Sequence, residues 1–85
     1  MNYPEDFKKE VKELYPGFPE IHKLLDNGGT FLGRYLDDSS SSSISIKDIL
    51  DATNLEDLQE RARKMQRKVK LYIKWCQLYD KQFNH

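Results

Sequence analysis

The longest uninterrupted pattern in this sequence runs from Thr53 to Phe83, and it constrains the fold more than any other feature. Apolar residues recur there in alternating steps of three and four: Leu55, Leu58, Ala62, Met65, Val69, Tyr72, Cys76, Tyr79 and Phe83. No glycine or proline interrupts this heptad seam, which is typical of one long amphipathic helix. We therefore predict a helix over about residues 54–83, with a capping box formed by Thr53 and Glu56 at its start.

Shorter apolar stripes, separated by turn residues, precede the long helix. The first contains Phe7, Val11 and Leu14 and ends at Pro16 and Gly17. Comparable stripes occupy residues 20–27, 30–36 and 46–52. Because each is long enough for two or three helical turns and none alternates like a strand, we predict an all-α fold. Three or four short N-terminal helices should pack on the long C-terminal helix in a single small domain, residues 1–85.

Five consecutive serines, residues 39–43, follow Asp37 and Asp38. Serine has little apolar surface to bury and competes for backbone hydrogen bonds, so a serine run is typical of a connecting segment. We predict a flexible, serine-rich loop over residues 37–44.

The charge is distributed unevenly along a chain whose formal net charge is zero. Residues 1–57 contain twelve acidic and six basic residues, whereas residues 58–85 contain two acidic and eight basic residues. The first part is therefore at −6 and the second at +6. This asymmetry is the most informative electrostatic feature of the sequence, because it gives the long helix a basic character.

A basic face follows from this asymmetry on the side of the long helix opposite the seam. Its residues are Arg63, Arg67, Lys70 and Lys74. Such a face can track a phosphate backbone, bind an acidic protein, or remain a solvated surface that the acidic N-terminal part partly neutralises. The sequence leaves these three alternatives open, so nucleic acid stays a possible partner.

Residues 20–36 have the outline of a weak helix-turn-helix, with a glycine turn between two short apolar helices. The second helix offers DNA only Thr30 and Arg34, with Asn27 from the turn, while Asp37 and Asp38 would repel phosphate. An ordinary pair of antiparallel helices explains the same pattern.

No residues have the spacing of a catalytic or metal-binding constellation. The chain has one cysteine, Cys76, and two histidines, His22 and His85, which do not form a metal-ligand set. We predict no catalytic residues, no metal, no cofactor and no small-molecule substrate. No apolar run suits a signal peptide or a membrane span, so we expect a cytoplasmic protein with no membrane partner.

The apolar surface of the long helix widens toward its C-terminal end. Leu71, Trp75 and Leu78 adjoin Tyr79 of the seam, and these four are the predicted partner-binding residues. We therefore expect a small, non-enzymatic, accessory or regulatory protein whose long helix docks on an unknown protein partner or on a second copy of the chain. The alternative is a nucleic-acid-binding protein that uses the basic face, with or without the helix-turn-helix at 20–36.

Overall fold

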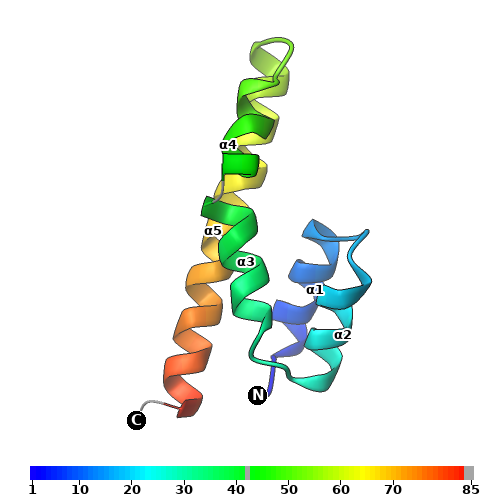
Figure 1. Cartoon of the computed structure of the whole chain (residues 1–85), viewed down its shortest axis with the longest axis vertical. Helices are drawn as coiled ribbons and strands as arrows, with labels where there is room; N and C mark the ends of the chain where they lie inside the picture. The colour runs from blue at the N-terminus through cyan, green and yellow to red at the C-terminus, as the bar shows by residue number, and fades with distance from the viewer. Residues whose placement is uncertain (42, 84–85) are drawn as a thin grey trace.

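The computed structural model describes residues 1–41 and 43–83 and contains five helices (Figure 1). These are α1 (Glu5–Leu14), α2 (Pro19–Asn27), α3 (Leu32–Ser41), α4 (Ser43–Leu50) and α5 (Leu55–Phe83). The described residues include no strand. The predicted all-α fold, with short helices packed on one long C-terminal helix, is confirmed. At about 1.5 Å per residue, α5 accounts for nearly the whole of the longest dimension of the molecule, 44 Å.

Two parts of the molecule share α5. Near the chain ends, α1, α2, α3 and the C-terminal half of α5 run alternately up and down as a four-helix base (Figure 1). Beyond the base, α4 continues in the direction of α3 and packs along the N-terminal half of α5. The α4–α5 hairpin therefore projects from the base, and only two helices cover each other there.

Among the residues whose side chains the structure describes, the hydrophobic core lies in the four-helix base. Its buried residues are Tyr3, Phe7, Val11, Leu14, Tyr15, Ile21, Leu25, Leu32, Leu36 and Leu71. The predicted apolar stripe of α1 is confirmed, since Phe7, Val11 and Leu14 are all buried. Burial of side chains of this size stabilises the folded state by roughly 1.5–3 kcal/mol each.

Local signals in the sequence set the helix ends. Gly28 ends α2 with φ 73°, a left-handed conformation that glycine adopts without a side-chain penalty. At the start of α5, the Asn54 side chain accepts the backbone N–H of Asp57 at 2.8 Å. The Asp57 carboxylate in turn accepts the backbone N–H of Thr53 at 3.0 Å. This reciprocal cap lies one residue later than the predicted pair, Thr53 and Glu56, because the asparagine side chain takes the capping position.

The serine-rich segment differs from the loop predicted for residues 37–44. Helix α3 continues to Ser41 and α4 begins at Ser43, while residue 42 lies outside the described residues. The Ser39 and Ser40 hydroxyls donate to backbone carbonyls three residues earlier, so they are satisfied within the helix. Because Ser40 is small and buried, it also lets α3 pack closely against its neighbours. The flexibility of this segment stays a prediction.

The buried line of α5 is also displaced from the predicted seam. Leu71, which is not a seam residue, is the one α5 residue of the core, with 1% of its surface exposed. The seam residues Met65, Val69 and Tyr72 are only half-buried. Helix α1 lies beside Arg67 and Lys74 of α5, and Gly33 of α3 lies against Trp75. Leu71 is one helical turn from Arg67, Lys74 and Trp75, so it lies between these two contacts and is buried by both.

This register predicts which substitution on α5 destabilises the fold. Leu71→Ala should lower the free energy of unfolding by about 2–5 kcal/mol, as for other buried leucines, because it leaves a cavity in the base. Val69→Ala should cost less than about 1 kcal/mol, because Val69 is half-exposed. Urea unfolding of both variants measures the difference. A larger loss for Val69→Ala would restore the seam as the buried line.

Candidate functional site: the α4–α5 hairpin and the corner groove

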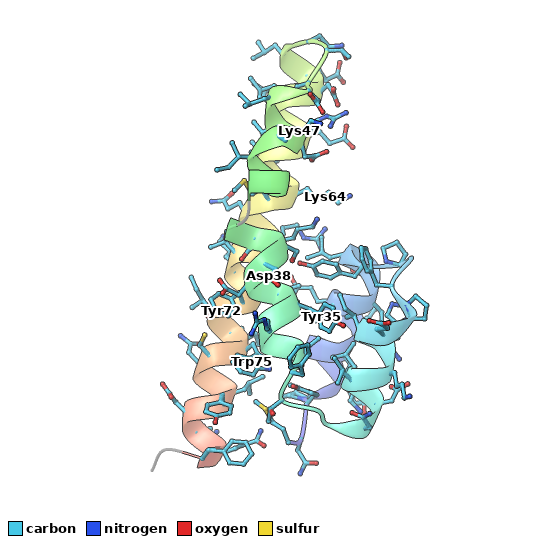
Figure 2. The ribbon with its side chains drawn as sticks, in the orientation of Figure 1. Tyr35, Asp38, Lys47, Lys64, Tyr72 and Trp75 are labelled. Atoms are coloured by element: carbon cyan, nitrogen blue, oxygen red, sulfur yellow. The ribbon has the colours of Figure 1, made fainter. Side chains whose placement is uncertain are left out.

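All four predicted partner-binding residues make contacts within the chain. Leu71 is buried, and Trp75 and Leu78 pack against the core. The Trp75 indole N–H donates to the Tyr3 hydroxyl at 3.0 Å, and the ring covers Gly33 of α3. Tyr79 stacks on Trp75 with ring centroids 5.2 Å apart. Figure 2 shows Trp75 and Tyr72 between α3 and α5. Leu71 therefore cannot be reached by a partner while the base stays folded.

Tyr3 connects three segments of the base that are distant in sequence. Its hydroxyl accepts the bond from Trp75 and donates to the Gly29 carbonyl oxygen at 2.8 Å. Its ring stacks on Phe7. Burial raises the pKa of Tyr3 above its ordinary value of 10.0, and the hydrogen bond from Trp75 opposes this only in part. The neutral phenol is therefore the form that holds α5 to the α2–α3 turn.

The predicted basic face is divided by the antiparallel contact of α1 with α5. Arg67 lies 3.8 Å from the Glu13 carboxylate, and Lys74 lies 3.8 Å from the Asp6 carboxylate. Arg63 and Lys70 are exposed. Two of the four basic residues thus face acidic groups of the same chain, so the face offers a phosphate backbone a smaller uncompensated charge than the sequence alone implies.

The region of the predicted helix-turn-helix forms α2 and the start of α3. Ile21 and Leu25 of α2 and Leu32 and Leu36 of α3 all belong to the core. Helix α3 contacts both α2 and α5, so two of its sides are covered. Of the candidate DNA contacts, Thr30 and Arg34 are exposed, whereas the Asn27 side chain accepts the backbone N–H of Gly29 and caps the turn.

The end of the α4–α5 hairpin carries an exposed apolar patch. We call it the hairpin tip; its residues are Ile46, Ile49, Leu50, Leu55 and Leu58. Leu50 exposes 77% of its surface, Leu55 exposes 69% and Ile46 exposes 51%. A shallow hollow at this end of the hairpin is lined by Ile49, Leu50 and Leu58. Contiguous apolar exposure of this kind marks interaction sites on soluble proteins.

Arg61 holds the hairpin together below the tip. Its guanidinium donates to both carboxylate oxygens of Asp57 at 3.1 Å and bonds the Asp48 carboxylate at 2.7 Å. The backbone N–H of Thr53, followed by the Arg61 side chain, lowers the pKa of Asp57. These polar bonds tie α4 to α5 where buried apolar side chains are sparse, and they fix the relative position of the tip residues.

A second feature, the corner groove, lies on the other side of the hairpin, where the base meets it. Its volume is about 570 Å³, and it is lined by Tyr15 and Phe18 from the α1–α2 turn, Tyr35 and Asp38 from α3, and Lys64 and Lys68 from α5. Figure 2 shows Lys64 projecting from α5 toward this side of the molecule, above Asp38 and Tyr35. Asp48 of α4 also lines the groove, so four separated segments supply its walls and no local sequence pattern predicts it.

Hydrogen bonds fix the walls of the corner groove. The Tyr15 hydroxyl bonds the Ser39 hydroxyl, and the Tyr35 hydroxyl donates to Glu20 at 2.7 Å. The His22 Nε2–H donates to the Tyr15 carbonyl oxygen at 2.7 Å, so this histidine orders the α1–α2 turn. Burial raises the pKa of Tyr15, and its bond to Ser39 opposes the shift. The aromatic walls are therefore held in place by bonds within the chain.

Among the residues that the structure describes, no three His, Cys, Asp or Glu side chains are grouped as a metal site. None of the helices in residues 1–41 and 43–83 is long and apolar enough to span a membrane. Comparison with protein-family models, with curated proteins and with solved structures finds no match to this chain.

The contact between Trp75 and Gly33 yields a stability prediction. A Cβ at Gly33 would overlap the far edge of the indole ring, which cannot shift without losing its bond to Tyr3 and its stacking on Tyr79. Gly33→Ala should therefore destabilise the protein by about 1–3 kcal/mol, although alanine normally favours a helix. Gly17→Ala is the matched control, since no atom lies within 4 Å of its added Cβ. Equal urea midpoints for the two variants would contradict this packing.

The raised pKa of Tyr3 yields a pH prediction. A phenol whose pKa is higher in the folded state contributes its full stability below the unfolded value of 10.0, and loses it as the pH rises through the folded value. We compare the free energy of unfolding of the wild type with that of Tyr3→Phe. The difference in favour of the wild type should be constant from about pH 8 to 9 and should become smaller above about pH 10. Urea unfolding of both proteins across this range measures it, and a constant difference up to pH 11 would refute the assignment.

Proposed function

We propose that this chain is a small, non-enzymatic protein-interaction module that docks on a partner protein, or on a second copy, through the projecting α4–α5 hairpin. The observation that carries the proposal is the exposure of Leu50 and Leu55, 77% and 69%, at the hairpin tip. Each Å² of this apolar surface that a partner covered would stabilise the complex by roughly 25 cal/mol. The long helix predicted to bind a partner keeps this role, but the surface moves from its C-terminal part to its N-terminal part.

The shape of the hairpin supports the same proposal. It extends beyond the base, so its tip can enter a groove of a partner without interference from α1 and α2 (Figure 1). The bonds from Arg61 to Asp48 and Asp57 reduce the freedom that binding would otherwise remove. An amphipathic hairpin that is already ordered binds at a lower entropic cost than a disordered segment would.

Nucleic acid binding through the basic face is the less supported alternative. Arg67 and Lys74 lie near Glu13 and Asp6, which leaves Arg63 and Lys70 as the two members of the predicted set with no salt bridge in the described part of the chain. Two cations would neutralise few phosphates, so the release of counterions would contribute less to affinity than it does in typical DNA-binding proteins, which make many phosphate contacts.

The test compares two sets of exposed apolar residues on the full chain. Leu50→Asp/Leu55→Asp should lower the melting temperature only slightly, because both leucines are exposed. An acid at Leu55 suits the N-terminus of α5, whereas an acid at Leu50 is mildly unfavourable at the C-terminal end of α4. Phe83→Asp is the matched control at the opposite end of α5, where Phe83 is 52% exposed. Immobilised wild type and Phe83→Asp should retain the same protein from a source-cell lysate, or the same free chain, whereas the double variant should not.

Salt and nuclease separate the two candidate functions. Apolar docking should persist in high salt and after nuclease treatment, while phosphate contacts weaken steeply with salt. Retention that survives in Leu50→Asp/Leu55→Asp would overturn the proposed docking surface. Retention that disappears with nuclease would favour the basic face instead.

A further inference from the structure

We propose that the corner groove is a binding site for a small amphipathic monoanion, a carboxylate head with an apolar chain, separate from the docking surface of the hairpin tip. The groove lies where the α1–α2 turn, α3 and α5 meet, and Asp48 of α4 closes its upper end. Its volume of about 570 Å³ falls within the range of about 300–1,000 Å³ that small-molecule sites occupy.

Lys68 is the group in the groove that an anionic ligand would stabilise most, because its charged ammonium is partly buried. Its ammonium lies over the Tyr15 ring, 5.2 Å from the centroid, and it is half-buried. Burial, followed by repulsion from Lys64, lowers the pKa of Lys68, whereas Asp48 acts in the opposite direction. The Asp48 carboxylate is already bonded to Arg61 at 2.7 Å. Within the described part of the chain no carboxylate forms a salt bridge with Lys68. An anion in the groove would therefore offset the free-energy cost of removing this ammonium from water.

The spacing of the two lysines favours one shared head group. Lys64 and Lys68 are one helical turn apart and line the same groove, so a carboxylate between them can accept a hydrogen bond from each ammonium. Asp38 on the α3 wall and Asp48 of α4 also line the groove, and Arg61 is shared between Asp48 and Asp57. The formal charge of the lining is therefore zero, with the two cations together on the α5 wall. A monoanion placed between them is repelled less by the two carboxylates than a dianion would be.

The remaining walls suit an apolar chain. Phe18 is 54% exposed at the mouth of the groove and meets Tyr15 edge-on, with ring centroids 5.9 Å apart. Ile21 and Met65 complete the apolar lining. A ligand chain placed there would cover Phe18, while its head group reached the two lysines. The bonds of Tyr15 to Ser39 and of Tyr35 to Glu20 hold these walls, so binding requires little reorganisation.

The test uses decanoate as the probe and decyltrimethylammonium as its cationic counterpart, both below micelle-forming concentrations. Amide NMR spectra of the full chain should shift around Tyr15, Phe18, Lys64 and Lys68 on titration with decanoate. The cation should bind at least about tenfold more weakly than decanoate. Lys64 and Lys68 would repel its trimethylammonium group, whereas they would donate hydrogen bonds to the carboxylate of decanoate. Equal affinity of the two probes, or shifts confined to the hairpin tip, would overturn the proposal.

Matched variants assign the binding to this groove. Lys64→Gln/Lys68→Gln should weaken decanoate binding about tenfold, and Phe18→Ala should weaken it severalfold. Arg63→Gln/Lys70→Gln removes two exposed charges from the same helix and should leave the affinity unchanged. An equal loss in the control pair would show a general charge effect and refute the site. Leu50→Asp/Leu55→Asp should bind decanoate normally, so failure of the proposed docking surface and failure of this ligand site are distinguishable.

Discussion

The contact of the Trp75 indole with Gly33 and Tyr3 is the interaction on which the rest of the structure depends. Helix α5 contributes Leu71 to the buried core, and Tyr72, Trp75 and Leu78 pack against that core from the same helix. The absence of a side chain at Gly33 lets the indole lie on α3, and the Tyr3 hydroxyl receives its N–H at 3.0 Å. Because Tyr3 also bonds Gly29, one aromatic pair joins the N-terminal segment, the α2–α3 turn and α5.

This attachment leaves the upper half of the molecule with a different physical character. In the base, aromatic and aliphatic side chains from four helices share a core, whereas the α4–α5 hairpin relies on the bonds of Arg61 to Asp48 and Asp57. A two-helix hairpin buries little apolar surface, so we expect it to open at a lower free energy than the base. The same property leaves its apolar tip available to a partner.

Charge follows the same division of the molecule. The acidic α1 runs antiparallel to the basic α5, so Asp6 meets Lys74 and Glu13 meets Arg67. These pairs are exposed and contribute at most about 1 kcal/mol each, but they direct α1 along α5 in one register. Lys64 and Lys68 lie beyond the end of α1, above the α1–α2 turn, and no carboxylate of α1 reaches them. Lys64 and Lys68, which line the corner groove, are therefore among the basic residues of α5 that α1 does not pair, together with Arg63 and Lys70.

The sequence by itself determined the helices, because their signals are local. The spacing of Phe7, Val11 and Leu14, the left-handed turn at Gly28 and the unbroken run to Phe83 each depend only on near neighbours in the chain. It indicated less well where α3 ends, since serines stay helical when their hydroxyls bond the preceding turn. Gly33 within a helical stripe was the available sign of close packing, because a glycine there often marks a close approach.

Only the tertiary structure decided which side of α5 is buried and where the candidate sites lie. The heptad seam and the line through Leu71 are both apolar, and the choice between them depends on the directions from which α1 and α3 approach. Trp75 and Leu78, apolar residues that suit a partner surface equally well, became internal contacts through the same packing. The corner groove combines Tyr15, Tyr35 and Lys68 from segments that are distant in sequence, so only the packing of the helices could bring them together.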